Sequence, residues 1–143
     1  MIVVASIVDG PVTLAAERSA VRSVSHRLEL ARNDGESGAT FRFEGIVRRL
    51  ESGRELESLE YEAYEPMAGR ELEMLAAGVA ESLGLTSIVA MHSRGRVGVG
   101  QVSFVLVVSS PHRAESLAAV SEFIDRLKRD IPIWKRPIWR NPI

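Results

Sequence analysis

The chain has 143 residues, of which 45% are hydrophobic and 26% are charged, as is typical of one globular domain with a substantial core. Its formal net charge of −1 gives no overall field that would favour nucleic acid or an anionic membrane surface, so we expect neither as a partner. The absence of cysteine excludes disulfides, thiolate catalysis and zinc–thiolate sites and is compatible with the cytoplasm, where we expect the protein to reside.

The apolar start of the chain lacks the features of a targeting segment. Residues 1–10 have no basic region ahead of the apolar run, and the run ends at Asp9, so we expect no signal peptide. No apolar run in the sequence approaches the length of a membrane span.

The first part of the chain predicts two strands separated by a helix. Residues 2–8 form a β-branched run that is followed by a turn signal, which predicts a strand. Residues 12–31 carry apolar side chains at helical spacing and predict one amphipathic helix. Residues 39–48 alternate as a strand does, and Gly45 within them predicts a bulge or a close approach.

A strand and a helix are predicted next. Residues 51–53 read as a turn, and residues 55–64 alternate as a strand with an acidic outer face. Pro66 suits the start of a helix and Gly84 suits its end. The apolar stripe of this helix consists of Leu72, Leu75, Val79 and Leu83.

Two further strands, at residues 86–92 and 101–109, flank a glycine-rich segment at residues 95–100. This segment, GRVGVG, contains a G-x-G pair, but it lacks the full G-x-G-x-x-G spacing and leads into a strand. A dinucleotide-binding fingerprint must open a helix, so a glycine turn between strands is the preferred interpretation.

The last predicted helix begins with Ser110 as N-cap and Pro111 as its first residue, and ends near Asp130 before Pro132. An irregular tail follows. Helices come after groups of strands, which favours an α+β fold with a mixed or antiparallel sheet and about three helices. We expect a single domain over residues 1–143.

The only two lysines, Lys128 and Lys135, lie seven residues apart, and the other 16 cations are arginine. Lys128 falls within about 40° of the predicted apolar stripe of the last helix. The lysine stem either covers apolar surface while its ammonium reaches water, or the ammonium is desolvated and serves as a base, acid or nucleophile. Arginine cannot do that work because it stays protonated. The stripe comprises Leu117, Val120, Ile124 and Leu127.

Residues around Lys135 leave two interpretations open. With a proline at position 132 and a spacing of seven residues, Lys135 either returns towards Lys128 or lies apart from it. Trp134 and Trp139 suit either the core or stacking on a flat ligand, and the core is preferred for each.

A second candidate anion site lies at the start of the last helix. His112 and Arg113 fall in its first turn, where free backbone N–H groups favour a phosphate. An arginine there opposes the helix dipole, so it either holds an anion or pairs with a nearby carboxylate. The three histidines show no metal-ligand spacing, and we expect no metal and no cofactor.

Several motifs in the order of one family occur over about residues 38–136. They are Gly38-Ala39, Phe43-x-Gly45-x-Val47-Arg48, the run from Leu59 to Ala68, His92-Ser93-x-Gly95-x-Val97-x-x-Gly100, the run from Val107 to Arg113, Leu127-Lys128, and the run from Ile131 to Lys135. As a set they resemble the large, catalytic subunit of molybdopterin synthase, the MoaE family.

The resemblance implies an α/β-hammerhead-type fold and a homodimer within a heterotetramer. Each large subunit of this family binds a small ubiquitin-like sulfur-carrier subunit (MoaD-like), whose C-terminal thiocarboxylate enters a pocket. Sulfur is transferred to cyclic pyranopterin monophosphate to form the dithiolene of molybdopterin. The resemblance implies Lys128 and Lys135 as catalytic residues. It implies that substrate is bound by Phe43, Arg48, His112 and Arg113.

The chain departs from the family pattern in places. Arg49, Leu50 and Glu51 follow the Val-Arg pair where the family usually has Asn or His, and Pro137 stands where Glu is frequent. Two other interpretations remain: a non-catalytic ligand-binding or regulatory α+β module derived from this family, and a nucleic-acid binder using the basic tail. Near-neutral net charge argues against the second.

Overall fold

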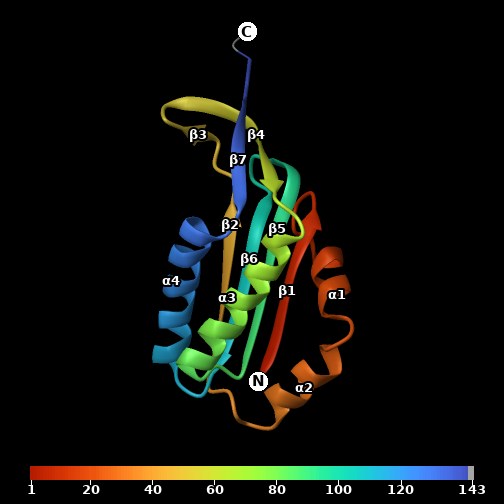
Figure 1. Cartoon of the computed structure of the whole chain (residues 1–143), viewed down its shortest axis with the longest axis vertical. Helices are drawn as coiled ribbons and strands as arrows, with labels where there is room; N and C mark the ends of the chain where they lie inside the picture. The colour runs from red at the N-terminus through yellow and green to blue at the C-terminus, as the bar shows by residue number, and fades with distance from the viewer. Residues whose placement is uncertain (142–143) are drawn as a thin grey trace.

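A mixed β-sheet runs along the molecule and carries helices on both faces (Figure 1). The computed structural model describes residues 1–141, so the domain expected over 1–143 extends two residues beyond the described part. The strands are β1 Ile2–Asp9, β2 Ala39–Ile46, β3 Leu50–Glu51, β4 Arg54–Ala63, β5 Ser87–Gly98, β6 Val102–Ser110 and β7 Ile133–Trp139. The helices are α1 Leu14–Val21, α2 Ser25–Asn33, α3 Met67–Leu83 and α4 Arg113–Asp130.

Strand β5 organises the sheet because it pairs with three other strands. One edge of β5 pairs antiparallel with β6, and β2 lies beyond β6. The other edge pairs in parallel with β1 along residues 87–94 and antiparallel with β4 along residues 95–98. Strands β7 and β3 both pair with β4. The α+β class with a mixed sheet is confirmed, with four described helices where about three were expected.

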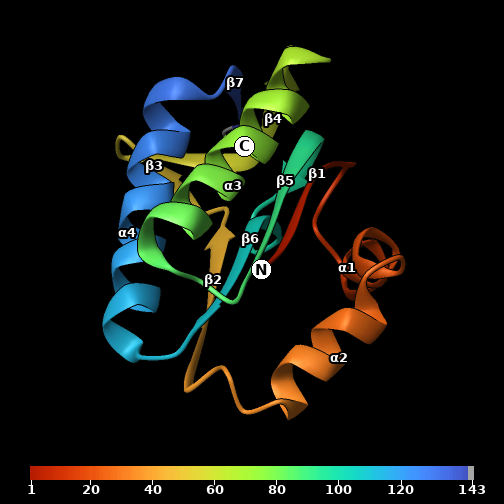
Figure 2. The same ribbon diagram turned by 60° about the horizontal axis from the view of Figure 1, so that its bottom comes forward.

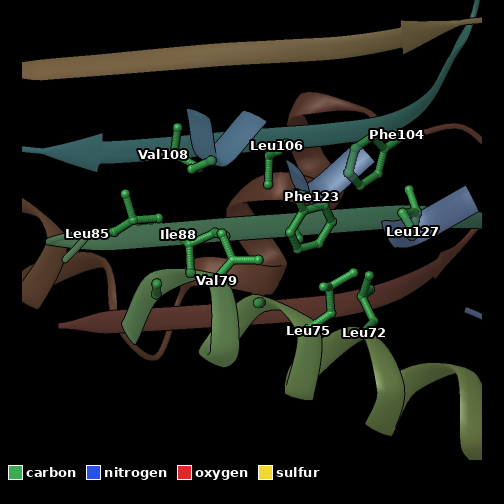
Figure 3. Close-up of a cluster of buried hydrophobic side chains, with 14 of the residues drawn as sticks. Leu72, Leu75, Val79, Leu85, Ile88, Phe104, Leu106, Val108, Phe123 and Leu127 are labelled. Carbon is green, nitrogen blue, oxygen red and sulfur yellow. The ribbon is translucent and has the colours of Figure 1, made fainter. Parts of the chain in front are cut away.

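The two faces of the sheet hold separate apolar clusters, because neighbouring side chains on a strand point in opposite directions. Ile88 and Ala90 of β5 face α3 and α4, and these helices complete the largest cluster of buried side chains (Figure 3). Val89 and Met91 face the other side, where α1 and α2 lie (Figure 2). The helices therefore cover both faces, and the sheet is the middle layer.

Helix α3 matches its prediction closely. Pro66 precedes its first residue, and Gly84 ends it in the left-handed conformation at φ 65°. Glycine suits this position because a side chain strains that conformation. Leu72, Leu75 and Val79 of the predicted stripe are buried.

The single helix predicted over residues 12–31 is instead two short helices. Helix α1 ends at Val21 and α2 begins at Ser25. The hydroxyl of Ser25 donates a hydrogen bond to the carbonyl of Arg22 at 3.2 Å. Such local side-chain bonds compete with the helical ladder, which accounts for the interruption.

Strand β5 is longer than predicted, and strand β7 was not predicted. Strand β5 continues to Gly98, and the turn comes at Gly100, where the amide of Gln101 donates to the carbonyl of Gly98. The expected irregular tail is strand β7, which pairs with β4 from Leu56 to Ala63. This pairing was missed because β7 contains a proline, which weakens a strand pattern but is tolerated on an edge strand.

Helix α4 begins later and is rotated relative to its prediction. Ser110 belongs to β6, and its hydroxyl donates to the carbonyl of His112 and hydrogen-bonds with the hydroxyl of Ser116. The N-cap is His112, whose side chain makes no capping hydrogen bond. The buried side chains are Ser116, Ala119, Phe123 and Leu127. Leu117 was expected in the buried stripe, but its exposed fraction is 51%. The small side chains of Ser116 and Ala119 determine which face of α4 is buried, because they allow the helix to approach the sheet closely.

We expect Phe123→Ala to lower the free energy of unfolding by about 3–5 kcal/mol, because it removes a fully buried ring and leaves a cavity. Phe123 stacks on Phe104 with ring centroids 5.9 Å apart. Urea denaturation followed by circular dichroism measures the change. Met74→Ala, at an exposed apolar residue of α3, is the control and should change stability by less than about 0.5 kcal/mol. Equal effects of the two substitutions would contradict this assignment of the core.

Candidate functional site

A cavity of about 640 Å³ lies where the ends of β2 and α4 meet strands β4 and β7. Four residues that the sequence singled out line it together: Phe43, Arg48, Lys128 and Lys135. They come from two segments, residues 43–48 and 128–135, that are 80 positions apart in the chain. The fold therefore brings three cations and an aromatic ring to one cavity.

The reversal between α4 and β7 places the two lysines on the same cavity. Helix α4 ends at Asp130, and the carbonyl of Pro132 accepts a hydrogen bond from the amide of Tyr64 at 3.0 Å. Strand β7 then runs antiparallel to β4, with Lys135 opposite Tyr61. The possibility that the proline turn returns Lys135 towards Lys128 is confirmed to the extent that both line this cavity.

Lys128 is exposed in the single chain, so its expected place on the buried face of α4 is wrong, and the structure agrees with the alternative in which its ammonium reaches water. The rotation of the helix described above turns it away from the core. It occupies the last turn of α4, where a cation also interacts favourably with the helix dipole. The desolvation that its proposed chemistry would require is therefore not supplied by the chain alone.

Lys135 forms an ion pair with Glu51, with the ammonium nitrogen 3.2 Å from a carboxylate oxygen. Glu51 lies on β3, also lines the cavity, and was noted from the sequence only as a departure from the family pattern. Lys135 was expected on a loose segment, but it lies on a paired strand. The ion pair and the strand both fix its position.

Aromatic rings contribute much of the cavity lining. Phe43 lies 6.1 Å from Phe104, and Tyr61 meets the ring of His92 edge-on at 5.1 Å, as measured between ring centroids. All four rings line the cavity. Trp134 lines the cavity too and is exposed, which departs from the preferred core interpretation. An aromatic lining of this kind suits a flat ring system.

His92 is a cavity residue that was given no role from the sequence, although it was tested for metal-ligand spacing and occurs in one of the family motifs. Burial lowers the pKa of His92 below its ordinary value. The hydrogen bond between its Nδ1 and the carbonyl of Ser93, at 2.8 Å, raises the pKa but does not cancel the effect of burial. The neutral ring therefore carries its proton on Nδ1, which donates to that carbonyl, and leaves Nε2 as an acceptor. The signal in the sequence was a polar residue ending the buried run of β5.

His112 and Arg113 do not line this cavity in the same chain. They begin α4, whereas Lys128 is in its last turn, and fifteen residues of helix between Arg113 and Lys128 span roughly 22 Å. Both are exposed. Gly38 packs against their turn so closely that a Cβ there would clash with the carbonyl oxygen of Pro111. This turn packs closely against Gly38 and lies at the opposite end of α4 from Lys128.

A second cavity of about 500 Å³ lies between the sheet and helices α1 and α2. Its lining is mostly aliphatic and hydroxyl side chains, and it contains none of the predicted site residues. Within residues 1–141, no three His, Asp or Glu side chains cluster as metal ligands would. No helix in the same part of the chain has the length and apolar character that crossing a membrane requires.

The fold and the first cavity define an α+β protein with a cationic, aromatic-lined site suited to a flat, anionic ligand. Comparison with known proteins gives the family. The family model described as "MoaE protein" matches residues 15–130, and the chain belongs to this family.

Named relatives agree with this assignment. The chain is 40% identical over 110 residues to a protein of Nostoc sp. named molybdopterin synthase catalytic subunit, covering 76% of this chain and 67% of the relative. A human protein of the same name is 42% identical over 104 residues, covering 73% of this chain and 55% of the relative. Among solved structures, molybdopterin synthase from Staphylococcus aureus is similar with a TM-score of 0.77 and 32% identity, covering 95% of this chain and 91% of that chain.

Because His92 is buried and its pKa is lowered, we predict that it makes a pH-dependent contribution to the free energy of unfolding. Its pKa is lower in the folded chain than the ordinary value of 6.5, so the unfolded chain binds more protons once the pH falls below that value. We expect the free energy of unfolding to fall on acidification below about pH 6.5, with a contribution from His92 of up to about 1.4 kcal/mol per pH unit. His92→Gln should remove this contribution, as measured by urea denaturation between pH 7 and pH 5 (~2 pH units).

The matched control is His26→Gln, at an exposed histidine of α2. Wild type and the control should share one pH slope, and His92→Gln should have a shallower one. A slope in His92→Gln as steep as in wild type would contradict the assignment of a buried neutral His92.

Proposed function

We propose that the chain is the catalytic subunit of molybdopterin synthase and acts as a sulfurtransferase. It moves sulfur from the thiocarboxylate of a small ubiquitin-like carrier to cyclic pyranopterin monophosphate. The observation that carries this proposal is the convergence of Lys128, Lys135, Arg48 and Phe43 on one cavity in a member of the MoaE family. Relatives that are at least 40% identical bear the name of this subunit.

The chemistry of the cavity suits both reactants. The carrier contributes an anionic thiocarboxylate, and the pterin contributes a phosphate and a flat ring. Cations that line a partly enclosed cavity stabilise such charges more strongly than they would in open water. Because the carrier supplies the sulfur, a chain without cysteine can carry out the transfer. Each transfer leaves the carrier with an ordinary carboxylate in place of the thiocarboxylate.

The residues take different roles in this proposal. Lys128 lies beside the carrier terminus and moves a proton during transfer, which an ammonium can do and a guanidinium cannot. Lys135 is held by Glu51 and stabilises negative charge at a fixed position. Phe43 packs on the pterin, and Arg48 binds its phosphate, a ligand that guanidinium groups recognise well.

His112 and Arg113 serve the same reaction from a neighbouring subunit. Roughly 22 Å of helix separates Arg113 from Lys128 within a chain, which is too far for both to contact one pterin. A homodimer in which each chain contributes its His112–Arg113 turn to the other chain's cavity removes this conflict. With one carrier on each cavity, the assembly is a heterotetramer.

The direct test combines the purified chain with a thiocarboxylated carrier and cyclic pyranopterin monophosphate, and measures dithiolene formation. The proposal expects product and also a stable complex with the carrier at micromolar concentrations by sedimentation. A chain that folds and binds neither reactant, or that binds the carrier without forming product, would instead be a non-catalytic member of the family.

Lys128→Ala should leave folding and carrier binding nearly intact and lower sulfur transfer by roughly two to four orders of magnitude, the usual range for a lost acid–base group. Lys128→Arg keeps the charge but not the proton transfer, so we expect little recovery of rate. Lys135→Arg should recover part of the rate lost in Lys135→Ala, because arginine can keep the ion pair with Glu51. Single-turnover kinetics measures all four variants, and a near wild-type rate for Lys128→Arg would reduce the role of Lys128 to charge alone.

Mixing an Arg113→Ala chain with a Lys128→Ala chain should restore activity that neither possesses alone. In a mixed dimer, one cavity receives both substitutions and the other receives neither, so one intact site forms. The measurement is the transfer rate after subunit exchange, with each variant mixed with itself as the control. Activity that stays at the level of the separate variants, although exchange is shown to occur, would contradict a site shared between chains.

A further inference from the structure

The cavity between the sheet and helices α1 and α2 takes no part in the proposed function. It lies on the face of the sheet opposite α3 and α4 (Figure 2), and it shares no lining residue with the cavity of the two lysines. Its volume of about 500 Å³ falls in the range of small-molecule sites. The cavity is therefore a separate candidate binding site.

The floor of this cavity has a polar end and an aliphatic end. Side chains two positions apart on a strand share a face, and strand pairing aligns them in rows across the sheet. One row carries hydroxyl groups on three adjacent strands, because Ser109 of β6 lies between Thr40 of β2 and Ser87 of β5. The next row sets Val107 opposite Val89. A ligand that covers this floor is therefore polar at one end and aliphatic at the other.

Helices α1 and α2 supply the opposite wall. Val21 of α1 and Leu28 of α2 line the cavity, and both pack against the apolar cluster that contains Val89. Within residues 1–141 the lining includes no aromatic side chain, in contrast to the first cavity. The apolar part of the site therefore suits an aliphatic chain, whereas the first cavity suits a flat ring.

The hydroxyl groups at the polar end have protons left to donate. Ser87 has an exposed fraction of 8%, and its hydroxyl has no hydrogen-bond partner within the described part of the chain. The hydroxyls of Thr40 and Ser109 bond to each other at 2.8 Å, and those of Ser37 and Thr86 do so at 2.6 Å. Each pair uses one of its two protons, so one O–H remains to donate. Such donors favour an anionic acceptor, which forms stronger hydrogen bonds than a neutral one.

Charges at the rim also favour an anion. Arg18 of α1 and Arg32 of α2 line the cavity, are exposed, and form no ion pair within residues 1–141. Of the two lining carboxylates, Glu17 is held by Arg42 at 2.7 Å, and Glu29 is exposed. The rim thus keeps two cations against one anion, an excess that one singly charged ligand balances.

We propose that this cavity binds an aliphatic monocarboxylate of medium chain length. Its carboxylate accepts hydrogen bonds from the hydroxyl row, and the two rim arginines compensate its charge. Its hydrocarbon chain lies between the valine row and the wall formed by Val21 and Leu28. A carboxylate fits better than a phosphate, whose charge near −2 exceeds that excess. The proposal is independent of sulfur transfer, because none of these residues serves the proposed reaction.

Calorimetric titration of the wild-type chain with decanoate, below the concentration at which it forms micelles, tests the binding. We expect a dissociation constant of roughly 10–100 µM, as is ordinary for a ligand of about 12 non-hydrogen atoms. Octanoate should bind roughly 10-fold more weakly, because each buried methylene group changes affinity by up to about fourfold. Acetate keeps only the head and 1-decanol only the chain, so each should bind at least about 10-fold more weakly than decanoate.

Ser87→Ala tests the polar end of the site. It removes an unpartnered hydroxyl, so the fold should survive, and decanoate should bind about 10-fold more weakly. Ser93→Ala is the matched control, because Ser93 lies on the same strand and also has a buried hydroxyl without a hydrogen-bond partner, but it does not line the cavity. It should bind decanoate as wild type does.

Val107→Phe tests the aliphatic end by placing a ring where the chain of the ligand would lie. It should keep the circular dichroism spectrum of wild type and lose measurable binding of decanoate. Val99→Phe, at an exposed position outside the cavity, is the control and should keep the binding.

Two substitutions in α2 test the charge at the rim. Arg32→Gln and Arg27→Gln remove the same charge from exposed positions of one helix, but only Arg32 lines the cavity. Arg32→Gln should weaken decanoate binding roughly threefold to fivefold, as expected for an exposed charge, and Arg27→Gln should leave it unchanged. Both should bind 1-decanol equally.

Three results would each overturn the proposal. They are no binding of decanoate up to about 1 mM, binding of 1-decanol as tight as that of decanoate, and equal binding by Ser87→Ala and Ser93→Ala. Val107→Phe that folds and still binds decanoate as wild type does would also exclude this cavity. Binding that is weakened in Ser87→Ala and Arg32→Gln and kept in their controls would establish the site.

Discussion

The antiparallel pairing of β7 with β4 is the contact on which the candidate site depends. It is anchored at one end by the hydrogen bond from the amide of Tyr64 to Pro132 and at the other by that from the amide of Arg140 to Glu55. Between these points β7 keeps one register from Ser58 to Ala63 of β4, which sets Lys135 opposite Tyr61, and the register shifts only between Leu56 and Ser58. Without this pairing, the residues after α4 would have no fixed direction and the second lysine would not share a cavity with the first.

Much of the fold could be predicted from local pattern, and the errors have physical causes. Helix α3 combined a strong apolar period with a proline start and a glycine end, so its bounds and buried face were both predictable. The buried face of α4 was not, because Ser116 and Ala119 are buried for their small size, which a search for large apolar residues overlooks. Strand β7 was missed because what stabilises it is a partner some 70 positions away. Long-range pairing of that kind leaves little trace in local composition.

The residues of the candidate site also divide into those that the sequence predicted and those that only packing in the folded chain reveals. Resemblance to a family supplied Phe43, Arg48 and both lysines, and the structure places them on one cavity. Glu51 and His92 were named from the sequence, but their place in the cavity was found only in the structure. Each is unremarkable by local pattern, and each matters through what packs against it: Lys135 for Glu51, and the rings of Tyr61 and Phe104 for His92. A neutral histidine among aromatic rings adds a hydrogen-bond acceptor to a cavity otherwise rich in cations, which would orient a donor group of a bound ring.

The use of lysine at only two positions fits this arrangement once the exposure of Lys128 is taken into account. Arginine serves where a permanent charge is sufficient, as in the pairs Arg42–Glu17 and Arg94–Asp9 and, in the proposed reaction, at Arg48. At the cavity a compact ammonium can approach a carrier terminus and exchange a proton, which arginine cannot. The chain alone leaves Lys128 in water, so its low-dielectric environment has to come from the bound carrier tail and from the neighbouring subunit. In the proposed assembly, the binding events that bring the reactants together are therefore also the events that exclude water from the lysine, and the catalytic group is activated only when the site is complete.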